Sequence, residues 1–177
     1  MRKILIILCL SSSLIGFTQD EKKPIFKQYE LKGNALLLLV GALDFSYEEY
    51  INHDTSYGIS AFIAYDKDID RKFSVTPYYR IYFGKKRAAG FFIEGFGMVN
   101  NYKTIAYTLE SMSYVALREA KVTDLALGFS LGGKWVTKSG VLFEISTGIG
   151  RNLFYKEDNV NRMEFVGRGG IGIGYQF

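Results

Sequence analysis

Residues 167–177 read GRGGIGIGYQF and end the chain. Apolar residues occupy every second position and small or polar residues lie between them: Ile171, Ile173, Tyr175 and Phe177 against Gly170, Gly172, Gly174 and Gln176. A period of two is typical of a β-strand with one apolar face. Chain ends usually fray and are polar, whereas this alternation continues to the last residue. The pattern therefore predicts a final strand that is held on both sides, in a sheet without a free edge.

The first residues have a different character. Arg2 and Lys3 precede an apolar run over 4–17, which is too short to span a bilayer as a helix but is typical of a secretory signal. We expect residues 1–18 to be a cleaved signal peptide and residues 19–33 to be a short charged lead. The single cysteine, Cys9, lies in the signal, so the exported chain has no disulfide to stabilise it.

Composition favours β-structure. Aromatic residues make up 16% of the chain, and 19 glycines stand against only 2 prolines. The formal net charge is +4 and falls to +2 without the signal, which is not the strongly basic balance of a nucleic-acid-binding protein. No apolar run after the signal approaches the roughly 20 residues of a membrane helix. A membrane-spanning form of this chain would therefore be a β-barrel.

Alternating or apolar stretches recur along the chain, separated by short polar connectors. They lie at 34–50, 56–65, 73–83, 91–99, 124–136 and 141–150, and the last begins near Met163. Outer-membrane barrels have an even strand number, so seven stretches predict an eighth strand. We expect it to arise from a tight hairpin at Gly41 that splits 34–50. The alternative is a hairpin within 100–122, which we otherwise interpret as a long loop that can include strand extensions. Pro77 lacks the ladder N–H and predicts a bulge or other irregularity in its strand.

Two features favour a membrane barrel over a soluble, lipocalin-like barrel. The second face of the strands is small, as at Gly128, Ser130 and Gly132, where a soluble barrel would present charged residues to water. Aromatic residues also lie near both strand ends, and the ten steps from Phe73 to Phe83 span about 25 Å at ~3.3 Å per residue and ~40° of tilt. This height matches the apolar belt of outer-membrane barrels. We predict an all-β, eight-stranded antiparallel up-and-down transmembrane barrel over residues 34–177 in the cell outer membrane.

The C-terminal strand carries a further signature. Gly172, Tyr175 and Phe177 resemble the signal that bacterial barrel-assembly machinery recognises. Four longer stretches resemble an outer-membrane barrel family catalogued as a domain of unknown function (family 3575): SVTPYYRIYFGKK (74–86), AAGFFIEGFGM (88–98), GGKWVTKSGVLFEISTGIGRNLF (132–154) and GIGYQF (172–177). The resemblance implies a small barrel and an outer-membrane location in a Gram-negative cell, and it implies no activity or catalytic residues.

Charged residues on the inward-facing parity form the candidate site. They are Asp44, Glu48, Arg80, Glu94, Asp124, Lys134, Glu144, Glu164 and Arg168. A small barrel barely holds its own side chains, and buried charges must be paired or hydrated. We therefore predict a lumen polar network built from seven of them: Asp44, Glu48, Arg80, Glu94, Lys134, Glu144 and Arg168. The alternative is a polar path that makes the barrel a narrow pore for ions or small solutes.

Few other residues suggest a catalytic, cofactor-binding or metal-binding site. Gly167, Gly169 and Gly172 match a dinucleotide-binding spacing, but no helix can follow them. His53 is the only histidine, so a histidine metal cluster is excluded, and it falls on a predicted short turn. We expect no enzymatic activity, no cofactor and no metal. Possible outer-loop contacts within 100–122 are Tyr102, Tyr107, Tyr114 and Arg118.

These observations predict a non-enzymatic outer-membrane barrel with a structural or surface-interaction role. The expected partners are outer-membrane lipid and, during biogenesis, the barrel-assembly machinery, with no nucleic acid and a monomeric barrel. After the narrow pore, the further alternatives are a rim enzyme that acts on lipids through His53 and a soluble periplasmic ligand-binding barrel.

Overall fold

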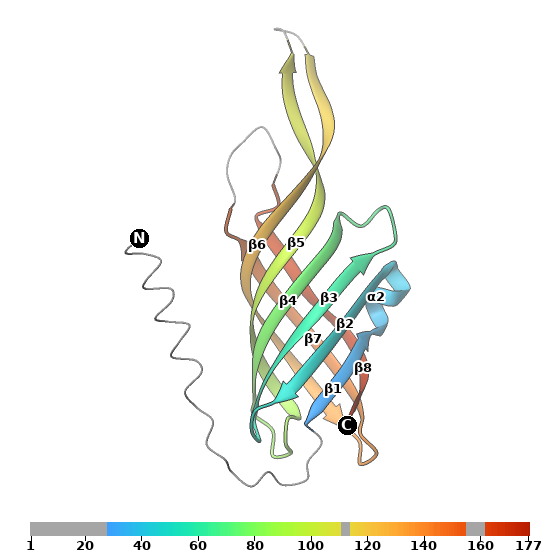
Figure 1. Cartoon of the computed structure of the whole chain (residues 1–177), viewed down its shortest axis with the longest axis vertical. Coiled ribbons are helices and arrows are strands. Elements are labelled where there is room, and N and C mark those ends of the chain that lie inside the picture. The colour runs from blue at the N-terminus through green and yellow to red at the C-terminus, as the bar shows by residue number, and fades with distance from the viewer. Residues whose placement is uncertain (1–27, 111–113, 155–161) are drawn as a thin grey trace, which may run out of the picture.

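The computed structural model describes residues 28–110, 114–154 and 162–177, without the side chains of 106–118. Eight antiparallel strands form one closed barrel in which each strand pairs with the next along the chain (Figure 1). The strands are β1 (Tyr29–Asn34), β2 (Ala42–Tyr50), β3 (Thr55–Ala64), β4 (Arg71–Tyr82), β5 (Gly90–Glu110), β6 (Tyr114–Val136), β7 (Val141–Asn152) and β8 (Phe165–Gln176). A short helix, α2 (Ala35–Val40), lies between β1 and β2. The predicted all-β, eight-stranded barrel is confirmed.

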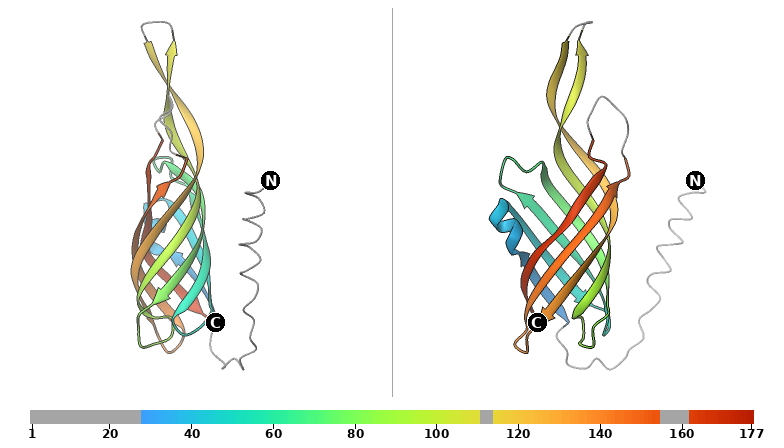
Figure 2. Two further views of the ribbon diagram at one scale, coloured as in Figure 1. Left: turned by 90° about the vertical axis from the view of Figure 1, so that its left-hand side faces the viewer. Right: turned by 180° about the vertical axis from the view of Figure 1, so that it is seen from behind.

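The last strand closes the sheet against the first. β8 pairs with β7 on one side and with β1 on the other, where Leu31 lies opposite Tyr175 and Gly33 opposite Ile173. The backbone N–H of Phe177 donates to the carbonyl of Tyr29 at 2.9 Å, so pairing extends to the final residue. The strands tilt around the barrel, as the side and rear views show (Figure 2). The apolar residues at the C-terminus are therefore part of the wall.

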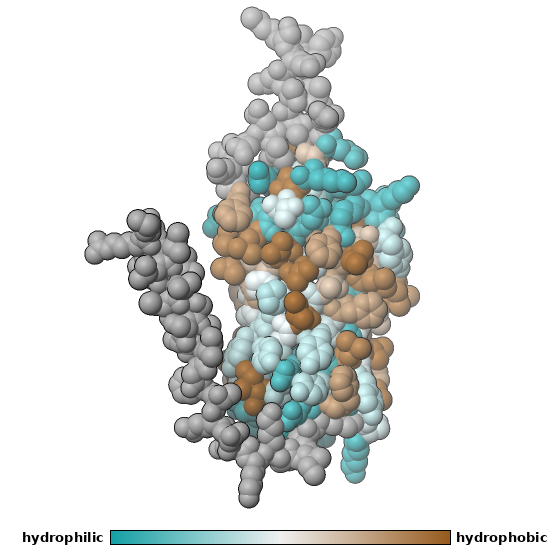
Figure 3. Space-filling view, in the orientation of Figure 1, coloured by the Kyte–Doolittle hydropathy of each residue, from teal (hydrophilic) through white to brown (hydrophobic). Residues whose placement is uncertain are grey.

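Apolar side chains of the wall point outward. Leu127 and Ile145 are each 55% exposed and Ile173 is 46% exposed, whereas Ser130 and Glu144, on the other parity, are buried. Hydrophobic residues form a band around the visible face, with hydrophilic residues above it (Figure 3). This orientation is the reverse of a soluble barrel, which buries its apolar face.

The eighth strand is not where the sequence predicted it. The hairpin expected at Gly41 is absent because residues 35–40 form α2, and the missing strand is β1. The Asn34 side chain accepts from the Leu37 N–H at 3.3 Å and caps the helix, while Gly41, at φ +106°, ends it in the left-handed region. The run ALLLLV does not alternate, so it lacks the strand period. The lead expected over 19–33 is consequently shorter, since β1 begins at Tyr29.

In the segment 100–122, the strand extensions that the sequence allowed take up nearly all of the expected loop. Its residues extend β5 and β6 into a hairpin that rises beyond the rest of the barrel (Figure 1), and their register is unbroken from Gly90↔Lys134 to Glu110↔Tyr114. The alternative of an extra strand pair hidden there is therefore wrong as well. Outside an apolar belt, both faces of a hairpin can be polar, so the apolar alternation disappears although the strands continue.

The short turns lie at the opposite end of the barrel from this hairpin. They connect β2 to β3, β4 to β5 and β6 to β7. His53 lies on the first of them, as predicted, and its carbonyl accepts from the Ala88 N–H at 2.9 Å. Pro77 causes no register shift, because the pairs on either side of it, Val75↔Val99 and Tyr78↔Phe96, share one register. The predicted irregularity is limited to the ladder with β5, in which Thr76 and Pro77 have no paired residue. The shift falls instead near the start of β4, between Arg71 and Phe73.

The predicted signal peptide, residues 1–18, lies outside the described residues, as does most of the predicted lead. Within the described ranges, no helix is both long enough and apolar enough to cross a membrane.

Candidate functional site in the barrel lumen

Eight charged side chains meet inside the barrel and form what we call the lumen charge cluster. Its members come from seven of the eight strands: Glu30, Lys32, Glu48, Arg80, Glu94, Lys134, Glu144 and Arg168. Four carboxylates face four cations, so the cluster is formally neutral. All except Arg168 have a side chain at most 6% exposed. Neutral pairing of this kind is the condition under which buried charges persist in a protein interior.

Lys32 lies at the centre of three carboxylates. Its Nζ is 3.0 Å from Glu30, 3.1 Å from Glu48 and 2.6 Å from Glu144. The oxygens of these glutamates converge within 4.8 Å, a grouping that could otherwise hold a hard metal ion. The ammonium group already occupies the position that such an ion would take. The site is therefore a lysine-centred ion-pair cluster.

Arg80, on β4, joins three strands across the lumen. Its guanidinium contacts Glu94 at 2.6 Å, Glu48 at 3.1 Å and Glu144 through two bonds of 2.6 and 2.9 Å. A planar guanidinium suits this bidentate contact with a carboxylate. Arg80 also lies over the ring of Phe92, 4.2 Å from its centroid. One side chain thus links β2, β5 and β7 through the middle of the barrel.

Lys134 extends the cluster toward the short turns. Its Nζ is 2.9 Å from Glu30 and 3.3 Å from Glu48, and it donates to the hydroxyls of Tyr50 and Tyr82. Tyr50 and Tyr82 in turn donate to Glu30 and Glu48. The two tyrosines therefore share the Glu30 Oε2 and Glu48 Oε1 acceptors with Lys134, and they close the lumen on that side.

Arg168 connects the cluster to the upper half of the barrel. It donates to Glu94 at 2.8 Å and to the Ser60 hydroxyl at 2.6 Å, and Glu94 also accepts from Ser130 at 3.0 Å. Asp44, expected in the same network, lies apart from it. Its nearest hydrogen bond is from the Asn34 side chain at 3.5 Å, and its Oδ1 is buried without a hydrogen-bond partner among the described residues.

Aromatic rings and glycines fill the rest of the lumen. Phe92 and Phe96 on β5 point inward against Gly132 and Gly128 of β6, where an added Cβ would collide with each ring. These glycines therefore provide room for large rings in a narrow barrel. Because of this packing, both faces of β5 carry aromatic residues, and its sequence alternates less clearly than that of the other strands.

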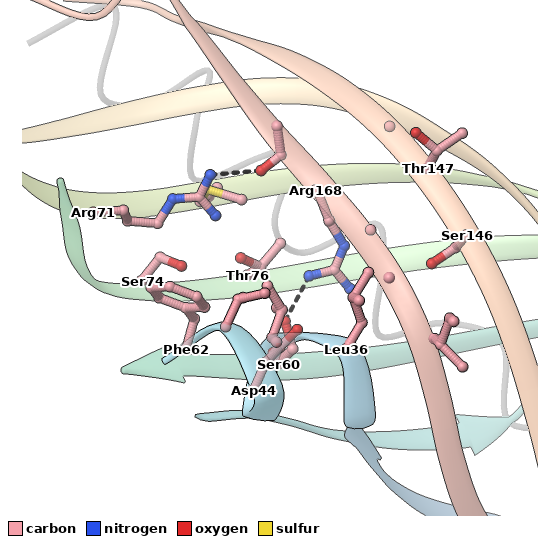
Figure 4. A pocket seen from close by; sticks show the side chains of 18 of the residues that line it. Leu36, Asp44, Ser60, Phe62, Arg71, Ser74, Thr76, Ser146, Thr147 and Arg168 are labelled. Atoms are coloured by element: carbon pink, nitrogen blue, oxygen red, sulfur yellow. Dashed lines mark hydrogen bonds between the residues drawn. The ribbon is translucent and has the colours of Figure 1, made fainter. Parts of the chain in front are cut away.

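Above the cluster the lumen opens into a cavity of about 660 Å³. Figure 4 shows its walls, which include Asp44 and Ser60, with Arg71 and Arg168 reaching in from opposite sides of the barrel. A much smaller space of about 30 Å³ adjoins Lys32, Arg80 and Glu144. The charge cluster and the tyrosines beneath it therefore separate this cavity from the end with the short turns.

The structure brings together six of the seven residues predicted for the lumen network, leaving Asp44 apart. It also shows that Asp124 and Glu164 have other roles: Asp124 accepts from backbone N–H groups of Leu125 and Phe154, and Glu164 pairs with Arg151 near the surface. Sequence reasoning missed Glu30 and Lys32, which were assigned to the charged lead. The sequence YELKGN does carry their signal, because Tyr29, Leu31 and Gly33 alternate with Glu30, Lys32 and Asn34.

Of the four residues predicted as outer-loop contacts, only Tyr102 has a described side chain. Tyr102 is buried, and its hydroxyl accepts from the Met163 N–H at 3.2 Å, so the prediction of an exposed loop contact is wrong for this residue. Tyr107, Tyr114 and Arg118 belong to the extended β5–β6 hairpin, and their side chains lie outside the described part of the structure. At the C-terminus, Tyr175 and Phe177 both point outward and are 48% and 54% exposed.

Comparison with known proteins adds a fold relative. The chain matches no protein-family model, and no curated protein matches it. Among solved structures, it is similar to the N-terminal β-barrel domain of Pseudomonas aeruginosa OprF, with a TM-score of 0.52 and 15% sequence identity. The match covers 85% of this chain and 98% of that domain. At this identity the likeness shows a shared barrel fold.

Proposed function

We propose that this protein is an integral outer-membrane β-barrel with a structural or surface-interaction role and no catalytic activity. The observation that carries the proposal is the inside-out distribution of side chains: an apolar outward band surrounds a lumen that holds the charge cluster. Such a band would be costly in water and is stable in hydrocarbon. The fold likeness to the OprF barrel domain supports the same location.

The distribution also counts against the soluble alternative. A periplasmic ligand-binding barrel would bury its apolar face and expose its charges. Here Glu48, Arg80 and Lys134 are buried in the lumen, while large apolar side chains cover the outside. Recovery of the exported protein in the outer-membrane fraction is the expected outcome, and recovery in the soluble periplasmic fraction would overturn the proposal.

The lumen charge cluster argues for a closed barrel over a conducting pore. Lys32, Arg80 and Lys134 bridge carboxylates on several strands, and tyrosines pack beneath them. We expect planar bilayers containing the purified protein to show no stable ohmic conductance. Sizeable conductance that falls when the charge of Arg80 or Glu94 is reversed would instead support the narrow pore.

We infer further that Gly172, Tyr175 and Phe177 form the assembly signal read by barrel-assembly machinery. Both aromatic side chains face outward at the seam where β8 meets β1, so they can be contacted before closure. Phe177→Ser should lower the yield of folded protein in the membrane. Phe154→Ser, which removes an exposed phenylalanine outside the last strand, is the matched control and should leave that yield unchanged.

A further inference from the structure

The barrel wall is incomplete beside α2. β1 pairs with β8 only from Glu30↔Gln176 to Asn34↔Gly172, whereas β8 begins seven residues earlier, at Phe165. On its other side, β1 pairs with β2 no further than Gly33↔Phe45, and β2 continues to Ala42. Above Asn34, α2 replaces a strand between β2 and β8 (Figure 1). The sheet is therefore closed below this level and has a lateral gap above it.

Side chains, not a strand, satisfy the open edge of β8. Asn34 Nδ2 donates to the carbonyl of Gly169 at 3.1 Å. Arg71 Nη2 reaches across the lumen to the carbonyl of Gly167 at 2.5 Å, and Figure 4 shows this bond of Arg71 as a dashed line. Gly169 and Gly170 both have φ of +147°, and a Cβ on Gly170 would collide with Asn34. These two bonds reduce the cost of an unpaired edge within hydrocarbon while leaving no strand across the gap.

The 660 Å³ cavity passes through this gap. Its lining includes buried lumen residues such as Ser74, Thr76 and Met98, and also Ile145 and Ile171, which face outward. The leucines of α2 lie along the same opening; Leu36 and Leu37 line the cavity, and no α2 residue is buried. The cavity therefore connects the lumen with the apolar surface of the barrel. Its volume lies within the roughly 300–1,000 Å³ of small-molecule sites.

The chemistry of the cavity is amphipathic. Leu36, Leu37, Val40, Phe62 and Met98 supply apolar walls. Three charged residues line the same space: Arg71, Asp44 and Arg168, the last of which already pairs with Glu94.

Arg71 and Asp44, unlike Arg168, have no ion-pair partner among the described residues. Within the described ranges, no carboxylate oxygen lies within 4 Å of the Arg71 guanidinium. Asp44 Oδ1 is buried and lacks a hydrogen-bond partner there. A buried oxygen of this kind is costly unless a donor meets it. A cation and an anion that each lack an ion-pair partner match a head group that carries both charges.

We propose that the cavity binds a single-chain zwitterionic amphiphile of the lysophosphatidylethanolamine class, which enters sideways from the membrane between α2 and β8. The alkyl chain lies against Phe62 and Met98. The phosphate accepts from Arg71, and the ammonium group donates to Asp44. The ligand therefore exchanges an apolar phase for an apolar cavity and gains two charge-assisted hydrogen bonds.

Photo-crosslinking of the full exported chain in lipid nanodiscs tests this inference. The probe is lysophosphatidylethanolamine with a diazirine near the end of its chain, and cross-linked residues are mapped by mass spectrometry. We expect adducts on Phe62 and Met98 inside the barrel, in addition to belt residues such as Leu127. Adducts confined to outward-facing residues would show annular lipid only and would overturn the proposal.

Variants separate the cavity from the head-group site. Ser74→Phe should fill the cavity and remove the lumen adducts while preserving those on the belt. Arg71→Gln and Asp44→Asn should each weaken competition by unlabelled lysophosphatidylethanolamine about tenfold, the effect of one lost charge-assisted bond. Arg151→Gln is the matched control, because Arg151 pairs with Glu164 outside the cavity, and it should change nothing. Arg71→Gln and Asp44→Asn keep the apolar walls, so they test the site even if Ser74→Phe fails to fold.

Two further probes define the ligand class. Lysophosphatidylglycerol, which lacks the ammonium group, should compete about tenfold more weakly than the ethanolamine lipid. Phosphoethanolamine without a chain should not compete. Equal competition by all single-chain lipids, unaffected by Arg71→Gln, would overturn the assignment of the head-group site.

Discussion

Replacing Lys134 by methionine tests the energetic role of the lumen charge cluster. The substitution keeps most of the side-chain volume but removes the ammonium group, which contacts Glu30 at 2.9 Å and Glu48 at 3.3 Å. It also removes the donor to the hydroxyls of Tyr50 and Tyr82. Four polar groups in a buried site therefore lose one shared partner, and the cluster gains a net negative charge.

The size of the expected loss of stability depends on the cations that Glu30 and Glu48 still contact after the substitution. Removing one member of a buried ion pair typically costs about 3–5 kcal/mol. Glu30 and Glu48 both keep Lys32, at 3.0 and 3.1 Å, and Glu48 also keeps Arg80 at 3.1 Å. We therefore expect the free energy of unfolding to fall by about 3 kcal/mol, the lower end of that range.

Equilibrium urea unfolding in lipid vesicles, followed by Trp135 fluorescence, measures this change. Lys103→Met is the matched control, since Lys103 and Glu119 form an exposed pair at 3.6 Å, and such pairs contribute less than about 1 kcal/mol. Lys134→Met combined with Glu30→Gln restores neutrality and should recover part of the loss. If Lys134→Met proved no more destabilising than Lys103→Met, the cluster would not stabilise the barrel as described.

Two further substitutions test local features. Gly132→Ala places a Cβ against the Phe92 ring and should lower the free energy of unfolding by about 1–3 kcal/mol. Gly95→Ala is the control, because its Cβ would meet no atom within 4 Å, and it should cost much less. Equal losses of stability in urea unfolding would show that the contact with the Phe92 ring does not matter. Asn34→Ala removes the cap on α2 and should cost about 1 kcal/mol, with faster amide hydrogen exchange at Leu37, and unchanged exchange there would contradict the cap.

The fold could be predicted from sequence because a barrel in contact with hydrocarbon repeats one simple pattern. The alternation of Ile171, Ile173 and Tyr175 was enough to orient β8, and the structure confirms that Ile173 and Tyr175 face outward. Alternation along β4 and β6 likewise predicted that Arg80 and Lys134 face the lumen, and both are buried there. What alternation could not supply was the pairing between these charges, because contacts across a lumen join residues far apart in sequence, such as Lys32 and Glu144.

β1 was missed for a physical reason. Charge in a short N-terminal segment usually indicates solvent, and Glu30 and Lys32 were interpreted in that way. In a barrel with a charged lumen, a strand can carry charges on its buried face and apolar residues such as Leu31 on its exposed face. Conversely, the apolar run 35–40 was interpreted as a strand, although it lacks alternation and is capped by Asn34 as a helix.

Depth-dependent fluorescence quenching tests the outward orientation of the apolar face most directly. Trp135 is the only tryptophan and is 58% exposed on the outer surface. Leu131→Trp in a Trp135→Phe background moves the reporter four residues along β6, about 10 Å along the membrane normal at ~3.3 Å per residue and ~40° of tilt. In vesicles of phospholipids brominated at known depths, we expect Trp135 to be quenched most by shallow bromines and the indole of the Leu131→Trp variant by deep ones. Absence of quenching at both positions would place this face in water and contradict the membrane barrel.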